Sequence, residues 1–183
     1  MLADLEEGVR IAGPDDEDAL LEAVRAMHRG GEWGLRYSSG APLCFSEPKT
    51  RRVVRNAINP MMRNDGQAWI GIVGDGAEIE GSACLSIGEA FCSEDPLLFE
   101  NWNFVLPEHR RSDNARRLIA CSTAMSRVLR LPLVIGVMSH VRTDAKCRLY
   151  ERSFGRPLGA LYLYNGDDAD GAGPAELTGV EQP

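Results

Sequence analysis

Residues 104–118, FVLPEHRRSDNARRL, join the end of an apolar strand to a helix that begins with arginines. The backbone N–H groups in the first turn of a helix have no partner within the helix, and the helix dipole places about half a positive charge there. A junction of this kind is suited to bind an anion such as phosphate. Four side chains add full positive charges around this point: Arg110, Arg111, Arg116 and Arg117.

The same segment resembles the acyl-CoA-binding motif of the GNAT superfamily of N-acyltransferases, which runs V-x-P-x-x-(R/Q)-x-x-G-x-(G/A) into a helix. Val105, Pro107, Arg110 and Ala115 fall on this pattern without a gap. The resemblance implies that the turn holds the pyrophosphate of acetyl-CoA, the cosubstrate. The residues expected to bind it are Val105, Arg110, Arg111, Ser112, Asp113, Asn114 and Ala115.

Asp113 stands where the family prefers its central glycine. A glycine lets the backbone approach a pyrophosphate closely, whereas a carboxylate at this position would face the phosphates. The alternative is that Asp113, or Ser112 before it, is the N-cap of a helix that binds no ligand. The sequence leaves both interpretations open.

A second motif, RLYERSFG, lies in a helix expected to begin near residue 142. It resembles the family's L-Y-x-x-x-G-F signature with the final pair inverted. The resemblance implies that Tyr150 lies beside the cofactor sulfur and protonates the departing thiolate, because a phenol with a pKa of about 10 stays protonated at neutral pH. Two positions depart from the family: its asparagine is Thr143 here, and its alanine is Lys146. Alternatively, Leu149, Tyr150 and Phe154 form only an apolar helix face.

Attack of an amine on a thioester requires a base that takes a proton from the amine. Glu100 is the best placed carboxylate, on the expected strand that leads into the phosphate turn, from which many GNAT enzymes present a glutamate. Strict alternation puts it on one face with Leu98, Trp102 and Phe104, where burial would raise its pKa. The glutamates at positions 89 and 94 compete for the role. The alternative is a strand-edge glutamate that points to water.

The elements expected around these motifs follow the order of the GNAT core. In residues 30–46 a long glycine-rich loop forms either part of the acceptor pocket or a flexible surface loop. Strands are expected at residues 9–12, 68–73, 79–87 and 97–105, with another, buried on both faces, at 131–138. Helices are expected from residue 13, at 48–63 with a perturbation at Pro60, at 112–130, and from about 142.

The chain has 183 residues, 44% of them apolar and 26% charged, as expected for one ordinary globular domain. We assign that domain to residues 1–165 and expect the acidic, glycine-punctuated residues 166–183 to be a disordered tail or linker. The fold class is α/β (α+β). The resemblance implies the GNAT acyl-CoA N-acyltransferase fold, a mixed central sheet of six to seven strands flanked by about four helices.

Several other classes of protein are disfavoured by the sequence. No run approaches the roughly 18 apolar residues of a membrane span, and the acidic start MLADLEEG lacks the basic residues of a signal peptide, so we expect a cytoplasmic protein. Five cysteines form no C-x-x-C pair and three histidines show no metal spacing. We therefore expect reduced structural thiols and no metal.

Charge is distributed unevenly along the chain. Residues 105–156 carry ten arginines and one lysine against four carboxylates, a net charge of +7, and the remainder carries −14. A basic half could face nucleic acid. However, the cofactor implied by the motifs carries phosphates that occupy part of this charge, and no patch interleaves aromatic with basic residues. The sequence therefore disfavours direct nucleic-acid binding.

These observations predict a GNAT acyltransferase that transfers an acetyl group from acetyl-CoA to a primary amine by direct attack. The acceptor is a small molecule or a protein. The phosphate turn and the tyrosine helix are also similar to those of small GNAT proteins from bacteriophages and prophages. The alternatives are an inactive binding or host-interaction module with this fold, which Asp113 favours, and a phage-type nucleic-acid-modifying enzyme. The oligomeric state, a dimer included, stays open.

Overall fold

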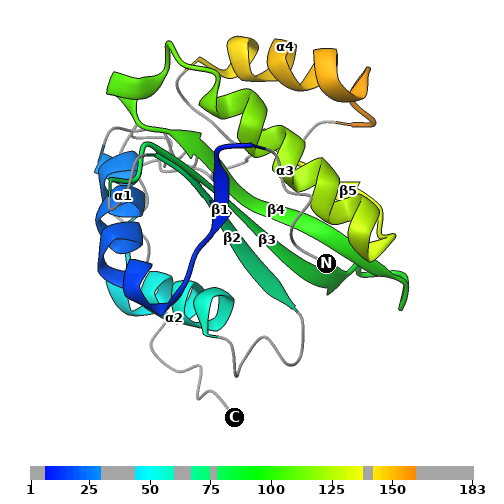
Figure 1. The fold of residues 1–183 in the computed structure, drawn as a ribbon. Coiled ribbons are helices and arrows are strands. Elements are labelled where there is room, and N and C mark those ends of the chain that lie inside the picture. The colour runs from blue at the N-terminus through cyan, green and yellow to red at the C-terminus, as the bar shows by residue number, and fades with distance from the viewer. Residues whose placement is uncertain (1–6, 30–43, 60–66, 75–77, 138–141, 160–183) are drawn as a thin grey trace, which may run out of the picture.

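The computed structural model describes residues 7–29, 44–59, 67–74, 78–137 and 142–159 (Figure 1). In these residues five strands form one sheet in the order β1-β2-β3-β4-β5. The strands are β1 (Val9–Ile11), β2 (Ala68–Val73), β3 (Gly81–Glu89), β4 (Pro96–Val105) and β5 (Leu133–Val134). The helices are α1 (Glu17–Arg29), α2 (Glu47–Ile58), α3 (Asn114–Leu129) and α4 (Thr143–Phe154), with short 3-10 helices at Pro14–Asp16 and Pro107–His109.

The sheet is mixed, because β1 to β4 pair antiparallel and β5 pairs parallel to β4. This sheet and its four helices confirm the predicted fold class. The described residues contain five strands, one or two fewer than predicted. The proposed domain boundary and acidic tail lie outside the described residues, as do most of the glycine-rich loop and the last four residues of the helix predicted at 48–63.

Each face of the sheet has its own apolar core. Helices α1 and α2 cover one face and α3 crosses the other (Figure 1). Trp102 and Phe104 belong to the α1 and α2 side, whereas Leu98 packs with Met125 of α3. The α1 and α2 core includes Leu20, Val24, Met27, Val54, Ile58, Ile70 and Ile72. Strand β4 thus contributes side chains to both cores.

Two predicted elements are shorter than expected. Helix α2 ends at Ile58 rather than residue 63, because Pro60 disfavours helical backbone at the residue before it, and Asn59 is extended with φ −76° and ψ 117°. The strand predicted at 131–138 is reduced to β5, and Val134 is 40% exposed. The expectation of a strand buried on both faces was therefore wrong.

Strand β4 contains one residue too many for regular pairing with β3. Cys84 pairs with Trp102 while the next residue, Leu85, pairs with Glu100, so Asn101 is inserted between two successive pairs. Such a bulge interrupts the alternation of side chains between the two faces. Glu100 consequently shares the α3 face with Leu98, as predicted, but Trp102 and Phe104 lie on the opposite face, which corrects the expectation from strict alternation.

The bulge also marks where β4 and β5 separate. Strand β5 pairs only with Leu98 and Phe99, immediately before the irregularity. Beyond this point β4 continues to Val105, whereas residues 136–137 lie across a cavity from it. The separation explains why β5 is short, and it leaves one edge of β4 available to a ligand.

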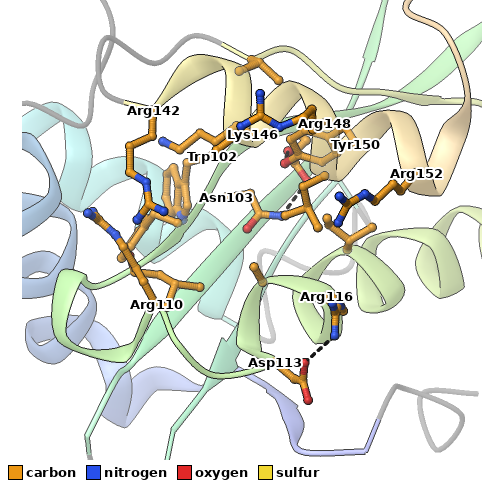
Figure 2. A pocket seen from close by; sticks show the side chains of 18 of the residues that line it. Trp102, Asn103, Arg110, Asp113, Arg116, Arg142, Lys146, Arg148, Tyr150 and Arg152 are labelled. Carbon is orange, nitrogen blue, oxygen red and sulfur yellow. Dashed lines mark hydrogen bonds and ion pairs between the residues drawn. The ribbon is translucent and has the colours of Figure 1, made fainter.

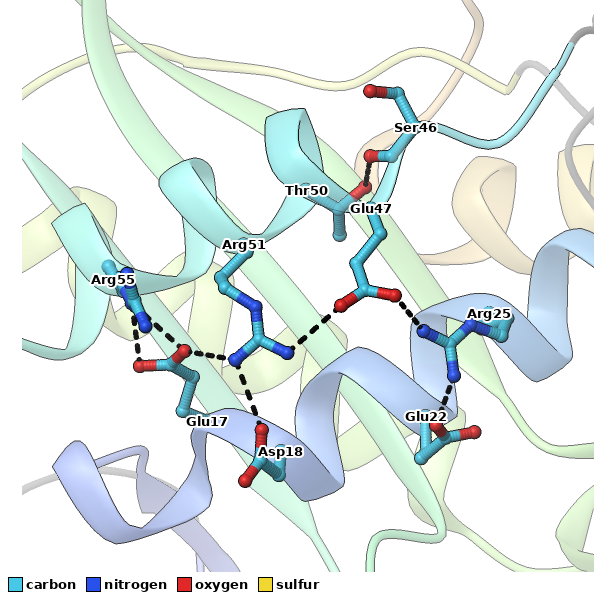
Figure 3. Close-up of polar contacts among 9 residues, drawn as sticks. All are labelled: Glu17, Asp18, Glu22, Arg25, Ser46, Glu47, Thr50, Arg51 and Arg55. Atoms are coloured by element: carbon cyan, nitrogen blue, oxygen red, sulfur yellow. Dashed lines mark hydrogen bonds and ion pairs between the residues drawn. The ribbon is translucent and has the colours of Figure 1, made fainter.

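An ionic network joins α1 to α2 (Figure 3). The Arg51 guanidinium lies 2.5 Å from Glu17 Oε1, 3.0 Å from Glu47 Oε1 and 3.1 Å from Asp18 Oδ1. Arg25 pairs with both Glu22 and Glu47, and Arg55 pairs with Glu17. The pKa of Glu17 is lowered, with the hydrogen bond from Arg55 as the largest cause. The pKa of Glu47 is lowered as well, with the hydrogen bond from Arg51 as the largest cause.

Arg51→Met should lower the melting temperature more than the matched change Arg52→Met, because Arg52 is an exposed neighbour on the same helix. The difference should shrink at high salt, which screens exposed ion pairs. It should also shrink as the pH falls through the carboxyl pKa values, because carboxyl groups with depressed pKa values stabilise the fold only when ionised. Thermal denaturation over salt and pH measures this, and a deficit unaffected by either variable would contradict an electrostatic network.

Candidate active site

A cavity of about 680 Å³ lies between β4, the first turn of α3 and α4 (Figure 2). Its walls come from residues 100–105 of β4, most of residues 110–116, residues 136–137 after β5, and one side of α4. The separation of β4 from β5 therefore opens directly onto the predicted phosphate turn. The same space contains Tyr150 and Glu100, which are 50 residues apart in the chain.

The predicted phosphate turn presents unpaired backbone donors to the cavity. Asn114 N–H donates to Ser112 Oγ at 3.3 Å, and the N–H groups of Arg116 and Arg117 donate to the Asp113 carbonyl. Within the described residues, no acceptor bonds the backbone N–H groups of Arg111, Asp113 or Ala115. All three residues line the cavity, so an anion there would meet both these donors and the positive end of the α3 dipole.

The Asp113 carboxylate is not the side-chain cap of α3, which was one of the two interpretations of the sequence. It accepts no hydrogen bond from the backbone N–H groups of the first turn of α3. Instead it pairs with Arg116 at 2.7 Å, and its side chain is 67% exposed at the edge of the cavity (Figure 2). Ser112 is the residue whose hydroxyl accepts a bond from the start of the helix.

Six of the seven residues predicted to bind the cofactor line the cavity: Val105, Arg110, Arg111, Ser112, Asp113 and Ala115. The exception is Asn114, which is buried and donates from Nδ2 to Glu80 Oε2 at 2.6 Å. Among the arginines, Arg116 lines the cavity, whereas Arg117 lies against Gly8. The sequence pattern thus located the turn but could not say which side chains point outward.

Glu80 anchors both ends of this turn from the connection before β3. Its carbonyl accepts the N–H of Leu106 at 2.8 Å, and its carboxylate binds Asn114 and lies 3.4 Å from His109 Nδ1. Arg110 adds an internal brace by donating from Nε to the Val105 carbonyl at 3.3 Å. These contacts hold the turn in place without using the donors that face the cavity.

Helix α4 and the residue before it contribute positive charges that the sequence analysis did not assign to the site: Arg142, Lys146, Arg148 and Arg152 all line the cavity. Arg148 and Arg152 are one turn apart and flank Tyr150, a spacing that could have identified them. Arg142 adopts φ 57°, a left-handed conformation that is uncommon for a residue other than glycine. Such backbone strain is concentrated at functional sites.

Tyr150 and Glu100 bond directly to each other. Tyr150 Oη donates to Glu100 Oε1 at 2.6 Å, so this glutamate does not point to water. Burial raises the pKa of Glu100, although bonds from Tyr150, Asn103 and Ser122 favour its ionised form. Burial also raises the pKa of Tyr150, and the neighbouring Glu100 carboxylate raises it further. The ring of Tyr150 stacks on Phe154 with centroids 6.1 Å apart, and no residue of α4 is fully buried.

Two residues that support Glu100 were missed by the sequence analysis. Asn103 Nδ2 donates to Glu100 Oε2 at 3.1 Å, and Ser122 Oγ of α3 lies 3.5 Å from the same oxygen. Residues three apart in a regular strand point to opposite faces. Only the inserted Asn101 brings Asn103 to the side of Glu100, so periodicity could not have predicted this contact.

A metal site, a membrane-spanning helix and disulfide bonds are all absent from the described residues. They contain no cluster of three or more His, Cys, Asp or Glu side chains able to hold a metal ion. None of their helices has the length and apolarity needed to span a membrane. The five cysteines are unbridged, and Cys84 and Cys121 are buried.

No protein-family model and no curated protein sequence matches the chain. Solved structures match it in fold. An aminoglycoside N-acetyltransferase, AAC(6')-Iy, in complex with CoA has a TM-score of 0.60 at 13% identity over 85% of this chain and 91% of that chain. The fold is that of the GNAT acetyltransferases.

Two further structures with the GNAT fold are similar to this chain. A ribosomal-protein-alanine N-acetyltransferase from Brucella melitensis biovar Abortus 2308 has a TM-score of 0.62 at 13% identity, over 85% of this chain and 95% of that one. A probable acetyltransferase has a TM-score of 0.59 at 16% identity, over 85% and 94% of the two chains. At such low identity these similarities establish the fold, and the function has to be argued from the site.

Ser112→Ala should destabilise the protein more than Asp113→Ala. The serine hydroxyl accepts from Asn114 and donates to the His109 carbonyl at 2.6 Å, so its loss should cost about 1 kcal/mol. Asp113 makes only an exposed ion pair, so its loss should change the free energy of unfolding by less than about 0.5 kcal/mol. Urea denaturation measures both, and the reverse order would make Asp113 the functional cap.

Proposed function

We propose that this chain is an N-acetyltransferase that transfers the acetyl group of acetyl-CoA to a primary amine. The amine attacks the thioester directly, without a covalent intermediate on the enzyme. One observation carries the proposal: a single cavity joins an anion-binding helix start to a bonded tyrosine–glutamate pair. The first feature suits the phosphates of CoA, and the second supplies a proton acceptor and a proton donor for the transfer.

The residues at the turn fit acetyl-CoA. The cavity volume of about 680 Å³ lies within the range of ordinary ligand sites. Backbone donors at Arg111, Asp113 and Ala115 and the side chains of Arg110 and Arg111 would hold the pyrophosphate, while the cations of α4 line the remaining wall. The cosubstrate supplies an activated acetyl group. The protein has to orient that group, remove a proton from the amine and supply a proton to the thiolate.

Glu100 and Tyr150 would carry out these proton transfers. An amine that forms a bond to carbon must lose a proton, and a carboxylate whose pKa is raised by burial is a stronger base than an exposed one. A departing thiolate gains a proton, and the Tyr150 hydroxyl is a donor in the same cavity. We therefore assign Glu100 as general base and Tyr150 as general acid.

The rival proposal, an inactive binding module, rested on Asp113 at the glycine position of the motif. Pairing of its carboxylate with Arg116 at the edge of the cavity weakens that objection, because the pair leaves the backbone donors of the turn open. The geometry of the site does not single out one chemical class of acceptor amine. Proteins of the same fold include aminoglycoside and ribosomal-protein-alanine acetyltransferases, so a useful panel contains amino sugars, polyamines, amino acids and peptides with free amines.

Acetyl-CoA at about one hundred times its dissociation constant should stabilise the protein by roughly 2.7 kcal/mol. Arg110→Ala should weaken its binding by about 1.5–3 kcal/mol, the value of a charge-assisted hydrogen bond. Arg117→Ala is the matched control, because this arginine of the same segment lies against Gly8 rather than in the cavity. Thermal-shift titration measures both, and an absence of any shift at millimolar acetyl-CoA would exclude a phosphate site at the turn.

Tyr150→Phe keeps the ring and its stacking on Phe154 but removes the proton donor. Turnover should fall by about 10² or more while acetyl-CoA affinity stays nearly constant. Glu151→Gln, an exposed neighbour on α4, should leave turnover unchanged. Release of CoA with the amine panel measures turnover, and a wild-type rate in Tyr150→Phe would remove this residue from the chemistry.

Glu100→Gln should also lower turnover, but its defect should depend on pH. Because burial raises the pKa of Glu100, the acidic limb of the wild-type rate should lie above the ordinary glutamate value of about 4.3. The variant should lose that limb and regain activity at high pH, where more of the amine is already neutral. A parallel loss at every pH would indicate that Glu100 only positions other groups.

A further inference from the structure

We propose that Tyr150 and Glu100 form one proton relay, in which the proton that Glu100 takes from the amine replaces the proton that Tyr150 gives to sulfur. The inference rests on the proposed function and adds to it a physical link between the two proton transfers. If the two residues acted separately, each would exchange its proton with water. In the relay, the proton that leaves nitrogen restores Tyr150 directly.

The hydrogen bonds around Glu100 determine where the amine proton arrives. Oε2 accepts from Asn103 Nδ2 at 3.1 Å and lies 3.5 Å from Ser122 Oγ, whose single proton also has the Leu118 carbonyl at 3.1 Å as an acceptor. Oε1 accepts only from Tyr150 Oη among the described residues. Each carboxylate oxygen has two acceptor sites, so Oε1 keeps one open site beside the Tyr150 hydroxyl. The amine proton would therefore join the oxygen that is already 2.6 Å from the tyrosine hydroxyl.

The charge of Glu100 controls whether Tyr150 can act as an acid. While Glu100 is ionised, the Tyr150 proton is held in the bond to Oε1, and its loss would leave a phenolate beside a carboxylate in a poorly hydrated site. Both effects raise the pKa of Tyr150. Protonation of Glu100 removes the repulsion and turns the carboxyl group from an acceptor into a donor. Deprotonation of the amine thereby enables donation by Tyr150.

The transfer balances without help from solvent. As the N–C bond forms, one proton passes from nitrogen to Glu100 Oε1, and the new carboxylic acid donates to Tyr150 Oη. The tyrosine O–H rotates toward the cavity and gives its proton to sulfur, which keeps the electron pair of the broken C–S bond. The Glu100 proton then moves to the phenolate oxygen. The products are the amide and the CoA thiol, and both side chains return to their initial states.

The other charged groups around the cavity do not compete for this proton. Among the described lining residues the only other carboxylate is Asp113, which is paired with Arg116. The charged groups that line the cavity from α4 are Lys146, Arg148 and Arg152, whose ammonium and guanidinium groups are donors and offer no acceptor.

A double-mutant cycle tests the relay with the full-length protein and any amine that the wild type acetylates. Tyr150→Phe and Glu100→Gln should each slow turnover by about 10² or more, and the double variant should be within about 3-fold of the slower single variant. Losses that multiply, to about 10⁴ or more in the double variant, would overturn the relay and leave two independent catalysts.

A second measurement needs no acceptor. Tyrosine ionisation is followed by absorbance in the wild type and in Glu100→Gln, each compared with a partner that also carries Tyr150→Phe. Removal of the carboxylate should shift the ionisation of Tyr150 toward the ordinary tyrosine pKa of about 10. Glu151→Gln, an exposed change on the same helix, should not shift it. An unchanged titration in Glu100→Gln would overturn the relay.

The two experiments separate failure of the relay from failure of the proposed function. If the wild type turns over no amine in the panel, the acetyltransferase proposal fails and the relay fails with it. If the wild type is active but the losses multiply, or if the tyrosine titration does not move, the relay fails and the acetyltransferase proposal stands.

Discussion

The insertion of Asn101 into β4 is the constraint on which the rest of the site depends. Because one residue is added between the pairs Cys84–Trp102 and Leu85–Glu100, the alternation of side chains between the two faces is shifted by one residue after it. Before the bulge β4 is an interior strand with β5 beside it. After the bulge its edge is open to the cavity and its side chains have exchanged faces. Asn101 itself is held by a bond to Ser86 Oγ at 2.9 Å, which fixes the irregular register.

Two electrostatic environments meet in the resulting cavity. At the phosphate turn and along α4, positive charges and backbone donors gather at partly exposed positions, where they suit a ligand with several negative charges. In the other part of the cavity Tyr150 donates a hydrogen bond to Glu100, and Asn103 and Ser122 lie against the other oxygen of the carboxylate. The first environment would bind and orient acetyl-CoA, and the second would accept and donate the protons of the transfer. They lie together because β4 runs from Glu100 straight into the turn.

Helix α4 is held differently from the other helices. Helices α1, α2 and α3 bury apolar residues against the sheet, whereas no residue of α4 is fully buried. One link from α4 to the sheet is the hydrogen bond between Tyr150 and Glu100. The contact that would carry the chemistry therefore also positions the helix. Substitution of Tyr150 by phenylalanine separates these roles better than substitution by alanine, because the ring can still stack on Phe154.

The sequence by itself determined the elements and the location of the site along the chain. Apolar periodicity and helix-start chemistry are local properties, so β2, α1, α3, α4 and the turn before α3 could all be predicted within a few residues. The tertiary structure decided what depends on pairing between distant segments. Register with β3 places the bulge at Asn101, brings Asn103 to Glu100 and ends β5 early. The tertiary structure also decided the partners of two residues at the start of α3. Asn114 bonds to Glu80, which is distant in the sequence, and the conformation of the turn pairs Asp113 with Arg116. A strand's own alternation contains no information about where its neighbour will require an extra residue.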